Sequence, residues 1–157
     1  TAIFKCLFSE NSAGYGGALR GSGSSTTTID ASFFSGNSAI NGGATLIDTA
    51  LDNAITDCVF SLNAAEDLGG GVCTPLEAYL KIVNSTFAGN SARRGGTLYA
   101  SDKSTVLVLN SILYDSTSPV VDGDERSSTQ ITYSDVQGGF IGQGNIDADP
   151  AFVDAAL

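Results

Sequence analysis

Hydrophobic and small residues recur along the chain with a period of 26 or 27 residues. In each copy an isoleucine is followed three positions later by a serine or cysteine, and five positions later by a phenylalanine. The isoleucines are Ile3, Ile29, Ile55 and Ile82, and the phenylalanines are Phe8, Phe34, Phe60 and Phe87. This spacing is neither the stripe of an amphipathic helix nor the alternation of a strand. It predicts a short strand, a bend and a second side chain that points inward.

Polar residues follow with the same period. Three positions after each phenylalanine comes an asparagine, and a pair of glycines follows. The asparagines are Asn11, Asn37, Asn63 and Asn90, and the glycine pairs are 16–17, 42–43, 69–70 and 95–96. Repeats of this length predict a solenoid, in which each coil buries its apolar side chains against its neighbours. Because glycine and asparagine interrupt every copy, we predict coils of two or three short strands and no helices.

Two weaker copies begin at Val108 and Ile131. We therefore predict an all-β fold of about six coils of 23–27 residues, forming one domain over residues 1–157. The coils begin near residues 3, 29, 55, 82, 108 and 131, and residues 137–157 form a C-terminal turn and partial cap. In that turn Asp149 and Pro150 are expected to end the last coil, and Phe152 to fold back over the core.

Stacked coils place each residue above its own kind in the next coil. We expect ladders of isoleucine, phenylalanine and small residues in the core, and a ladder of asparagines whose side-chain amides bond from coil to coil or to the backbone of the turns. Asparagine also tolerates the left-handed backbone of a tight bend. The glycine pairs suit a turn with positive φ or a close approach to the neighbouring coil.

The motif Phe-x-x-Asn-x-Ala-x-x-Gly-Gly-Ala resembles the repeats of right-handed parallel β-helix proteins, among them the polymorphic outer-membrane proteins of chlamydiae. The segments from Asn110 to Leu113, from Ile131 to Gly139 and from Gly144 to Asp154 are similar to the C-terminal coils of large secreted bacterial β-helix proteins. The resemblance implies a right-handed parallel β-helix, secreted or on the cell surface, with a structural or adhesive role and no catalysis. Polysaccharide lyases and glycoside hydrolases share the fold, so a fragment of such an enzyme is the alternative.

The charge and residue composition exclude several classes of binding partner. The chain carries 7 basic and 17 acidic residues, giving a net charge of −10 and a pI near 4.1. Such a surface repels nucleic acid and anionic membranes, and no apolar run is long enough for membrane insertion. The absence of histidine from the sequence excludes histidine-dependent nucleophiles and histidine-bound zinc. Cys6, Cys58 and Cys73 are interpreted as small core residues, with a Cys58–Cys73 bridge as the alternative.

Candidate chemistry is sparse. Asp30 and Asp57 lie diagonally in adjacent predicted coils and, with Lys5 nearby, form the best candidate catalytic group. The acidic loop of Asp122, Asp124 and Glu125 is a candidate calcium site, because calcium prefers oxygen ligands. A second acidic pair, Asp147 and Asp149, is a weaker candidate. No other cofactor is predicted.

The predicted ends of the stack of coils indicate how the chain could associate with other molecules. Ala2, Ile3 and Phe4 enter the first coil directly, and Phe152 and Val153 offer at most a partial cap. Uncapped coils expose strand edges and apolar ladders. We therefore expect self-association through the solenoid ends, which would build filaments if copies stack head to tail. A carbohydrate or host-surface ligand is the other expected partner.

Overall fold

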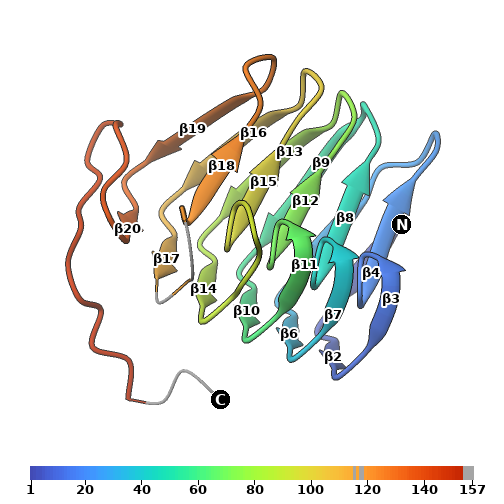
Figure 1. Ribbon diagram of the computed structural model, residues 1–157, viewed down its shortest axis with the longest axis horizontal. Coiled ribbons are helices and arrows are strands. Elements are labelled where there is room, and N and C mark those ends of the chain that lie inside the picture. The colour runs from blue at the N-terminus through green and yellow to red at the C-terminus, as the bar shows by residue number, and fades with distance from the viewer. Residues whose placement is uncertain (115, 117–118, 154–157) are drawn as a thin grey trace.

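The computed structural model describes residues 1–114, 116 and 119–153, and these residues form the predicted parallel β-helix (Figure 1). The described residues contain strands, turns and bends but no helix, and so no helix that could cross a membrane. Asp154, which belongs to the predicted tail motif, and the predicted cap beyond residue 153 lie outside the described residues.

Four parallel sheets run along the stack, named here A to D in the order in which each coil visits them. Sheet A contains β1 (Ala2–Phe4), β5 (Thr28–Asp30), β9 (Asp52–Thr56), β13 (Tyr79–Val83), β16 (Thr105–Leu109) and β19 (Ser128–Thr132). Sheet B contains β2 (Leu7–Ser9), β6 (Phe33–Ser35), β10 (Val59–Ser61), β14 (Thr86–Ala88), β17 (Ile112–Tyr114) and β20 (Asp135–Val136). Sheet C contains β3 (Ser12–Tyr15), β7 (Ser38–Asn41) and β11 (Ala64–Leu68). Sheet D contains β4 (Leu19–Ser22), β8 (Thr45–Asp48), β12 (Val72–Thr74), β15 (Leu98–Ala100) and β18 (Val121–Gly123).

The pairing register follows the sequence repeat. The leading apolar residues of all six coils pair in sheet A, in the order Ile3, Ile29, Ile55, Ile82, Val108 and Ile131. Five coils are followed by a partial sixth, which contributes only β19 and β20. The expectation of two or three strands per coil is wrong for the first three coils, which have four. The glycine pair turns the chain sharply enough to separate a strand of sheet C from a strand of sheet D.

Three corners with positive φ bend each of the first four coils. At the first corner the residues are Lys5, Ala31, Asp57 and Asn84, and at the second they are Glu10, Gly36, Leu62 and Gly89. At the third corner the first glycine of each pair takes this role, at Gly16, Gly42, Gly69 and Gly95. The asparagines predicted to supply left-handed bends do not have positive φ; the residue before each of them does. Their side chains are used for hydrogen bonding instead.

The core is a set of ladders inside the four sheets. The rings of Phe8, Phe34, Phe60 and Phe87 stack with centroids 4.6–4.8 Å apart. This offset matches the spacing of stacked strands, so each ring covers the next. A smaller cluster of Leu46, Cys73 and Tyr99 lies on the other side of sheet D, where Leu68 packs over it.

The two ends of the stack differ. In coil 1 Cys6 is exposed and Ile3 and Phe8 are only half-buried, although the same positions are buried in the inner coils. Phe4 and Leu7 are exposed as well, on the outer faces of sheets A and B. At the other end Phe140 packs against the core, whereas the predicted Phe152 is half-buried and is not among the side chains packed there. The backbone N–H of Val136 donates to the carbonyl of Ile146 at 2.9 Å, so residues near 146 add a short layer above coil 6.

Candidate functional site

The repeated asparagines form a buried hydrogen-bonded ladder. Oδ1 of Asn63 accepts the backbone N–H of Asn37 at 3.0 Å and its side-chain Nδ2 at 2.9 Å. Nδ2 of Asn63 in turn donates to Oδ1 of Asn90 at 3.0 Å and to the carbonyl of Phe34 at 2.9 Å. Asn11 donates to Asn37 in the same way at the exposed end. These amides therefore join coils and satisfy buried backbone groups.

The small residues three positions after each leading isoleucine form a second ladder. The backbone N–H of Cys58 donates to Oγ of Ser85 at 3.2 Å, and that hydroxyl donates to the carbonyl of Val83 at 2.9 Å. The same pattern continues through Ser111 and Ser134. A small side chain with both a donor and an acceptor is needed here, which explains why every coil has serine or cysteine at this position.

Asn145 closes the serine ladder at the C-terminal end. Its Oδ1 accepts the backbone N–H of Ser134 at 3.1 Å, and its Nδ2 donates to the carbonyls of Ile131 and Phe140 at 2.8 and 3.1 Å. Sequence reasoning missed this residue because it lies 11 positions after Ser134, outside the repeat. Its only signal is an asparagine next to Gly144.

The glycine pairs have two separate roles. The first glycine has positive φ, for example +67° at Gly42. The second glycine lies against the backbone of the next coil: a Cβ at Gly43 would be 2.3 Å from the carbonyl oxygen of Gly70. The first glycine of each pair is therefore needed for its positive φ, and the second for its close approach to the neighbouring coil, the two roles predicted from the sequence.

The structure places the aspartates of the predicted catalytic group diagonally in adjacent coils, as the sequence columns predict. Asp30 is the last residue of β5 and pairs with Thr56, whereas Asp57 lies on the following corner. Lys5 places its ammonium 4.8 Å from the centroid of the Phe4 ring. Asp57 and Lys5 are exposed and Asp30 is half-buried. Catalysis by this group remains a prediction.

The carboxylates of the acidic loop are already hydrogen-bonded. Asp122 accepts two hydrogen bonds from Arg94, at 2.7 and 3.2 Å, and these lower the pKa of its carboxyl group. Asp124 accepts the backbone N–H groups of Asp102, Arg126 and Ser127, which lower its pKa. Glu125 is exposed.

Neither acidic loop gathers a set of metal ligands. The described residues contain no group of three or more histidine, cysteine, aspartate or glutamate side chains placed to hold a metal. Asp147 and Asp149 are exposed, and Oδ1 of Asp149 accepts the N–H of Ala151 at 2.8 Å, as in a turn. Calcium binding by either loop remains a prediction.

Arginine–tyrosine pairs stand at both ends of the outer cluster of Leu46, Cys73 and Tyr99. Arg94 lies 4.9 Å from the Tyr99 ring centroid, and Arg20 lies 5.6 Å from that of Tyr15. Each pair flanks a glycine turn, with the arginine before the turn in one coil and after it in the other. No prediction from the sequence included these pairs. The exchange of arginine and tyrosine at the same repeat positions is the signal that would have found them.

The three cysteines are free thiols in two environments. Cys58 and Cys73 are buried, as predicted, and burial raises the pKa of both, that of Cys73 to about 12. The alternative Cys58–Cys73 bridge is wrong. The interpretation of Cys6 as a core residue is also wrong, because its position in coil 1 is exposed.

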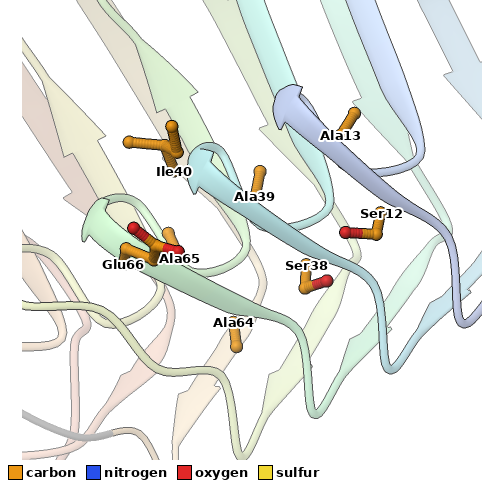
Figure 2. Close-up of a pocket in the computed structure, with 8 residues that line it drawn as sticks. All are labelled: Ser12, Ala13, Ser38, Ala39, Ile40, Ala64, Ala65 and Glu66. Atoms are coloured by element: carbon orange, nitrogen blue, oxygen red, sulfur yellow. The ribbon is translucent and has the colours of Figure 1, made fainter.

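A shallow hollow crosses the outside of sheet C. Figure 2 shows its lining, which comes from three coils: Ser12, Ala13, Ser38, Ala39, Ile40, Ala64, Ala65 and Glu66. Its volume is about 230 Å³. The small side chains follow the strand register, with Ser12, Ser38 and Ala64 in one row. Ser12, Ser38 and Glu66 contribute its only polar side chains, so the hollow offers few groups that could fix the orientation of a ligand.

Comparison with known proteins gives one match. The model of the Chlamydia polymorphic membrane protein repeat matches residues 5–22, which include the first asparagine and the first glycine pair. No curated protein and no solved structure shows significant similarity to the chain. Together with the stacked parallel sheets, the match shows that this chain is a β-helix repeat protein resembling the chlamydial polymorphic membrane protein repeats.

Proposed function

We propose that this chain is a secreted or surface-exposed β-solenoid with a structural or adhesive role and no catalytic activity. The match to a membrane protein repeat supports a β-helix associated with the cell surface or outer membrane. The observation that carries the proposal is the use of the repeated residues. The phenylalanine, asparagine and serine or cysteine of each inner coil are buried and contact the same residues in the next coil. The repeated residues therefore serve to hold the coils of the solenoid together.

The surface charge is consistent with this role. Five of the seven basic residues pair with carboxylates, in the pairs Arg20–Asp48, Arg93–Asp67, Arg94–Asp122, Lys103–Glu77 and Arg126–Asp102. Little positive charge is left to bind a polyanion such as nucleic acid or pectin. The excess of acidic residues keeps an extracellular rod soluble.

Surface labelling of intact source cells tests the location. Lys5, Lys81 and Lys103 are exposed, so a membrane-impermeant amine reagent should modify them without lysis. Labelling that appears only after lysis would overturn the proposed location, and a cytoplasmic protein of the same cells serves as the control.

An assay with purified protein tests the absence of catalysis. We expect no release of reducing ends or unsaturated products from pectin, alginate or β-glucan. Release by the wild-type chain that is lost in Asp30→Asn or Asp57→Asn would establish the enzyme alternative instead.

Self-association is a second proposal, and the exposed residues of coil 1 favour it. Cys6 is exposed there and Ile3 is only half-buried, and within the described part of the chain no strand pairs with the outer edges of β1 and β2. Such edges readily accept another chain. Phe140 covers part of the core at the opposite end. A second copy meeting coil 1 would therefore give pairs more readily than long filaments. Sedimentation should show a concentration-dependent dimer that Cys6→Arg abolishes, and a monomer at all concentrations would contradict this proposal.

A further inference from the structure

A second hollow, of about 480 Å³, lies where coils 5 and 6 meet the C-terminal segment. Residues of two strand registers form its sides. Asn110 and Tyr133 follow the paired strand ends of β16 and β19, and Asp135 pairs with Ile112 on one side and bridges to Ile146 on the other. Pro150 completes the wall. Mixed apolar walls with a few polar groups are typical of small-ligand sites.

The Tyr133 ring is held in place and presented to solvent. Gly144 lies so close to it that a Cβ there would be 2.5 Å from Cδ1 of the ring. The backbone N–H of Tyr133 donates to the carbonyl of Gln143 at 2.8 Å, which fixes the same segment. Even so, the side chain is 52% exposed. One side of a fixed aromatic ring is therefore free to pack against a ligand.

Two polar groups converge on the same space. The carboxylate of Asp135 is oriented by one hydrogen bond, in which Oδ1 accepts the N–H of Ala148 at 3.0 Å. The described residues offer no donor to its second oxygen. Nδ2 of Asn110 donates to Oδ1 of Asn84 at 2.7 Å, and this orients the amide of Asn110 at the rim. An oriented carboxylate and an oriented amide are suited to binding neighbouring hydroxyl groups.

The negative charge around the hollow favours a neutral ligand over an anionic one. None of the residues that line it is basic, Asp135 is acidic, and the chain has a net charge of −10. An anionic ligand such as a uronic acid would be repelled. The remaining features are an aromatic face, two isoleucines and hydrogen-bonding groups for hydroxyls. A neutral sugar ring, apolar on its C–H face and rich in hydroxyls at its edge, matches all of them.

We propose that this hollow binds a neutral saccharide, with the sugar ring stacked on Tyr133 and its hydroxyls hydrogen-bonded to Asp135 and Asn110. The inference deepens the proposed adhesive role by naming a ligand class, and it rests on that role for its biological setting. Binding is measured on the purified chain, so its failure would leave the surface location and the structural role untouched.

The test is an NMR titration of the ¹⁵N-labelled chain with cellohexaose, chitohexaose and maltohexaose at millimolar concentration. We expect at least one sugar to shift the amide signals of Tyr133, Asp135 and Ile146 in a saturable way. Tyr133→Ala should weaken this binding at least about tenfold, which corresponds to about 1.4 kcal/mol. Tyr133→Phe keeps the ring and should retain the binding.

Tyr15→Ala is the matched control, because Tyr15 is 51% exposed but lies at the opposite end of the stack. It should leave sugar binding unchanged. Asp135→Asn, which keeps an oxygen to accept the Ala148 N–H, should weaken binding without unfolding the cap. The proposal is overturned if none of the three sugars shifts these signals, or if Tyr133→Ala binds as tightly as the wild type while its circular dichroism shows an intact fold.

Discussion

Asn63 holds Asn37 by two hydrogen bonds at once: its single Oδ1 atom accepts both the backbone N–H of Asn37, at 3.0 Å, and the side-chain amide, at 2.9 Å. Both residues are fully buried. Because no water reaches them, the loss of one partner leaves several polar groups unsatisfied. The asparagine ladder is thus a connection between coils whose strength depends on burial.

Replacement of a buried ladder asparagine should therefore be costly. We expect Asn63→Ala to lower the free energy of unfolding by about 3 kcal/mol or more, since it strands the N–H of Asn37 and the carbonyl of Phe34. Asn11→Ala, at the exposed end, should cost less than about 1 kcal/mol. Urea denaturation followed by circular dichroism measures both. Equal losses would show that burial does not set the strength of the ladder.

Two adjacent phenylalanines provide a matched test of the stacked core. Phe34 is completely buried between Phe8 and Phe60, whereas Phe33, on the outer face of sheet B, is 51% exposed. Phe34→Ala should cost about 3–5 kcal/mol of unfolding free energy, and Phe33→Ala about 0.5 kcal/mol. Chemical denaturation of the two variants gives the comparison. A larger effect at Phe33 would mean that the strand register is shifted by one residue.

The second glycine of each pair should tolerate no side chain. Gly43→Ala would place a Cβ 2.3 Å from the carbonyl oxygen of Gly70, a backbone atom that cannot move without separating the coils. We expect a loss of about 3 kcal/mol or more, or failure to fold. Gly14→Ala meets nothing within 4 Å and should change the melting temperature little. Similar melting temperatures for the two variants would contradict the packing described here.

The thiols should differ in reactivity. In the native protein at neutral to mildly basic pH, a thiol reagent should modify Cys6 quickly and leave Cys58 and Cys73 unmodified, because those two are buried and burial raises their pKa. After unfolding in guanidinium, the reagent should modify all three cysteines. Mass spectrometry of the labelled peptides identifies the sites. Rapid native labelling of Cys73 would show that the outer cluster opens.

The buried thiol of Cys73 should make the folded state less stable at basic pH. The pKa of Cys73 rises from 9.0 to about 12 on folding, so the folded state retains the proton more tightly. The contribution of Cys73 to stability is therefore constant below pH 9.0 and falls as the pH rises from 9.0 toward 12. Denaturation curves across this range, compared with those of Cys73→Ala, should show a steeper loss for the wild type. If the unfolding free energies of the two proteins fall equally with pH, Cys73 is not the cause of the loss.

The repeat in the sequence was sufficient to predict the sheets that carry it. Ile55 and Phe60 recur at fixed spacing, and a parallel stack is the arrangement that places each above its own kind. The extra strand of each early coil was missed because the glycine turn, which separates sheets C and D, has no apolar pattern of its own. A partial cap over residues 137–157 was predicted, but the roles of Phe140 and Asn145 in it were not, because each acts once and no repeat marks it.

The candidate sites were harder to predict, since surface chemistry depends on which side chains a corner brings together. Asp57 lies on the corner that follows Thr56, the partner of Asp30, so the sequence columns place the two residues correctly but do not show whether their side chains meet. Tyr133 gains its setting from Gly144, which the period of the repeat does not place beside it. Contacts between the repeat and the segment that follows it required the structure.

Native-state hydrogen exchange tests most directly the claim that coil-to-coil side-chain ladders hold this rod together. The backbone amides of Asn37, Asn63 and Ser85 donate to side chains of the next coil. They should exchange only through global unfolding, with an opening free energy equal to that measured by denaturation. The amide of Gly14, on the exposed strand β3, should exchange orders of magnitude faster. Exchange of the three ladder amides at the rate of Gly14 would contradict the account.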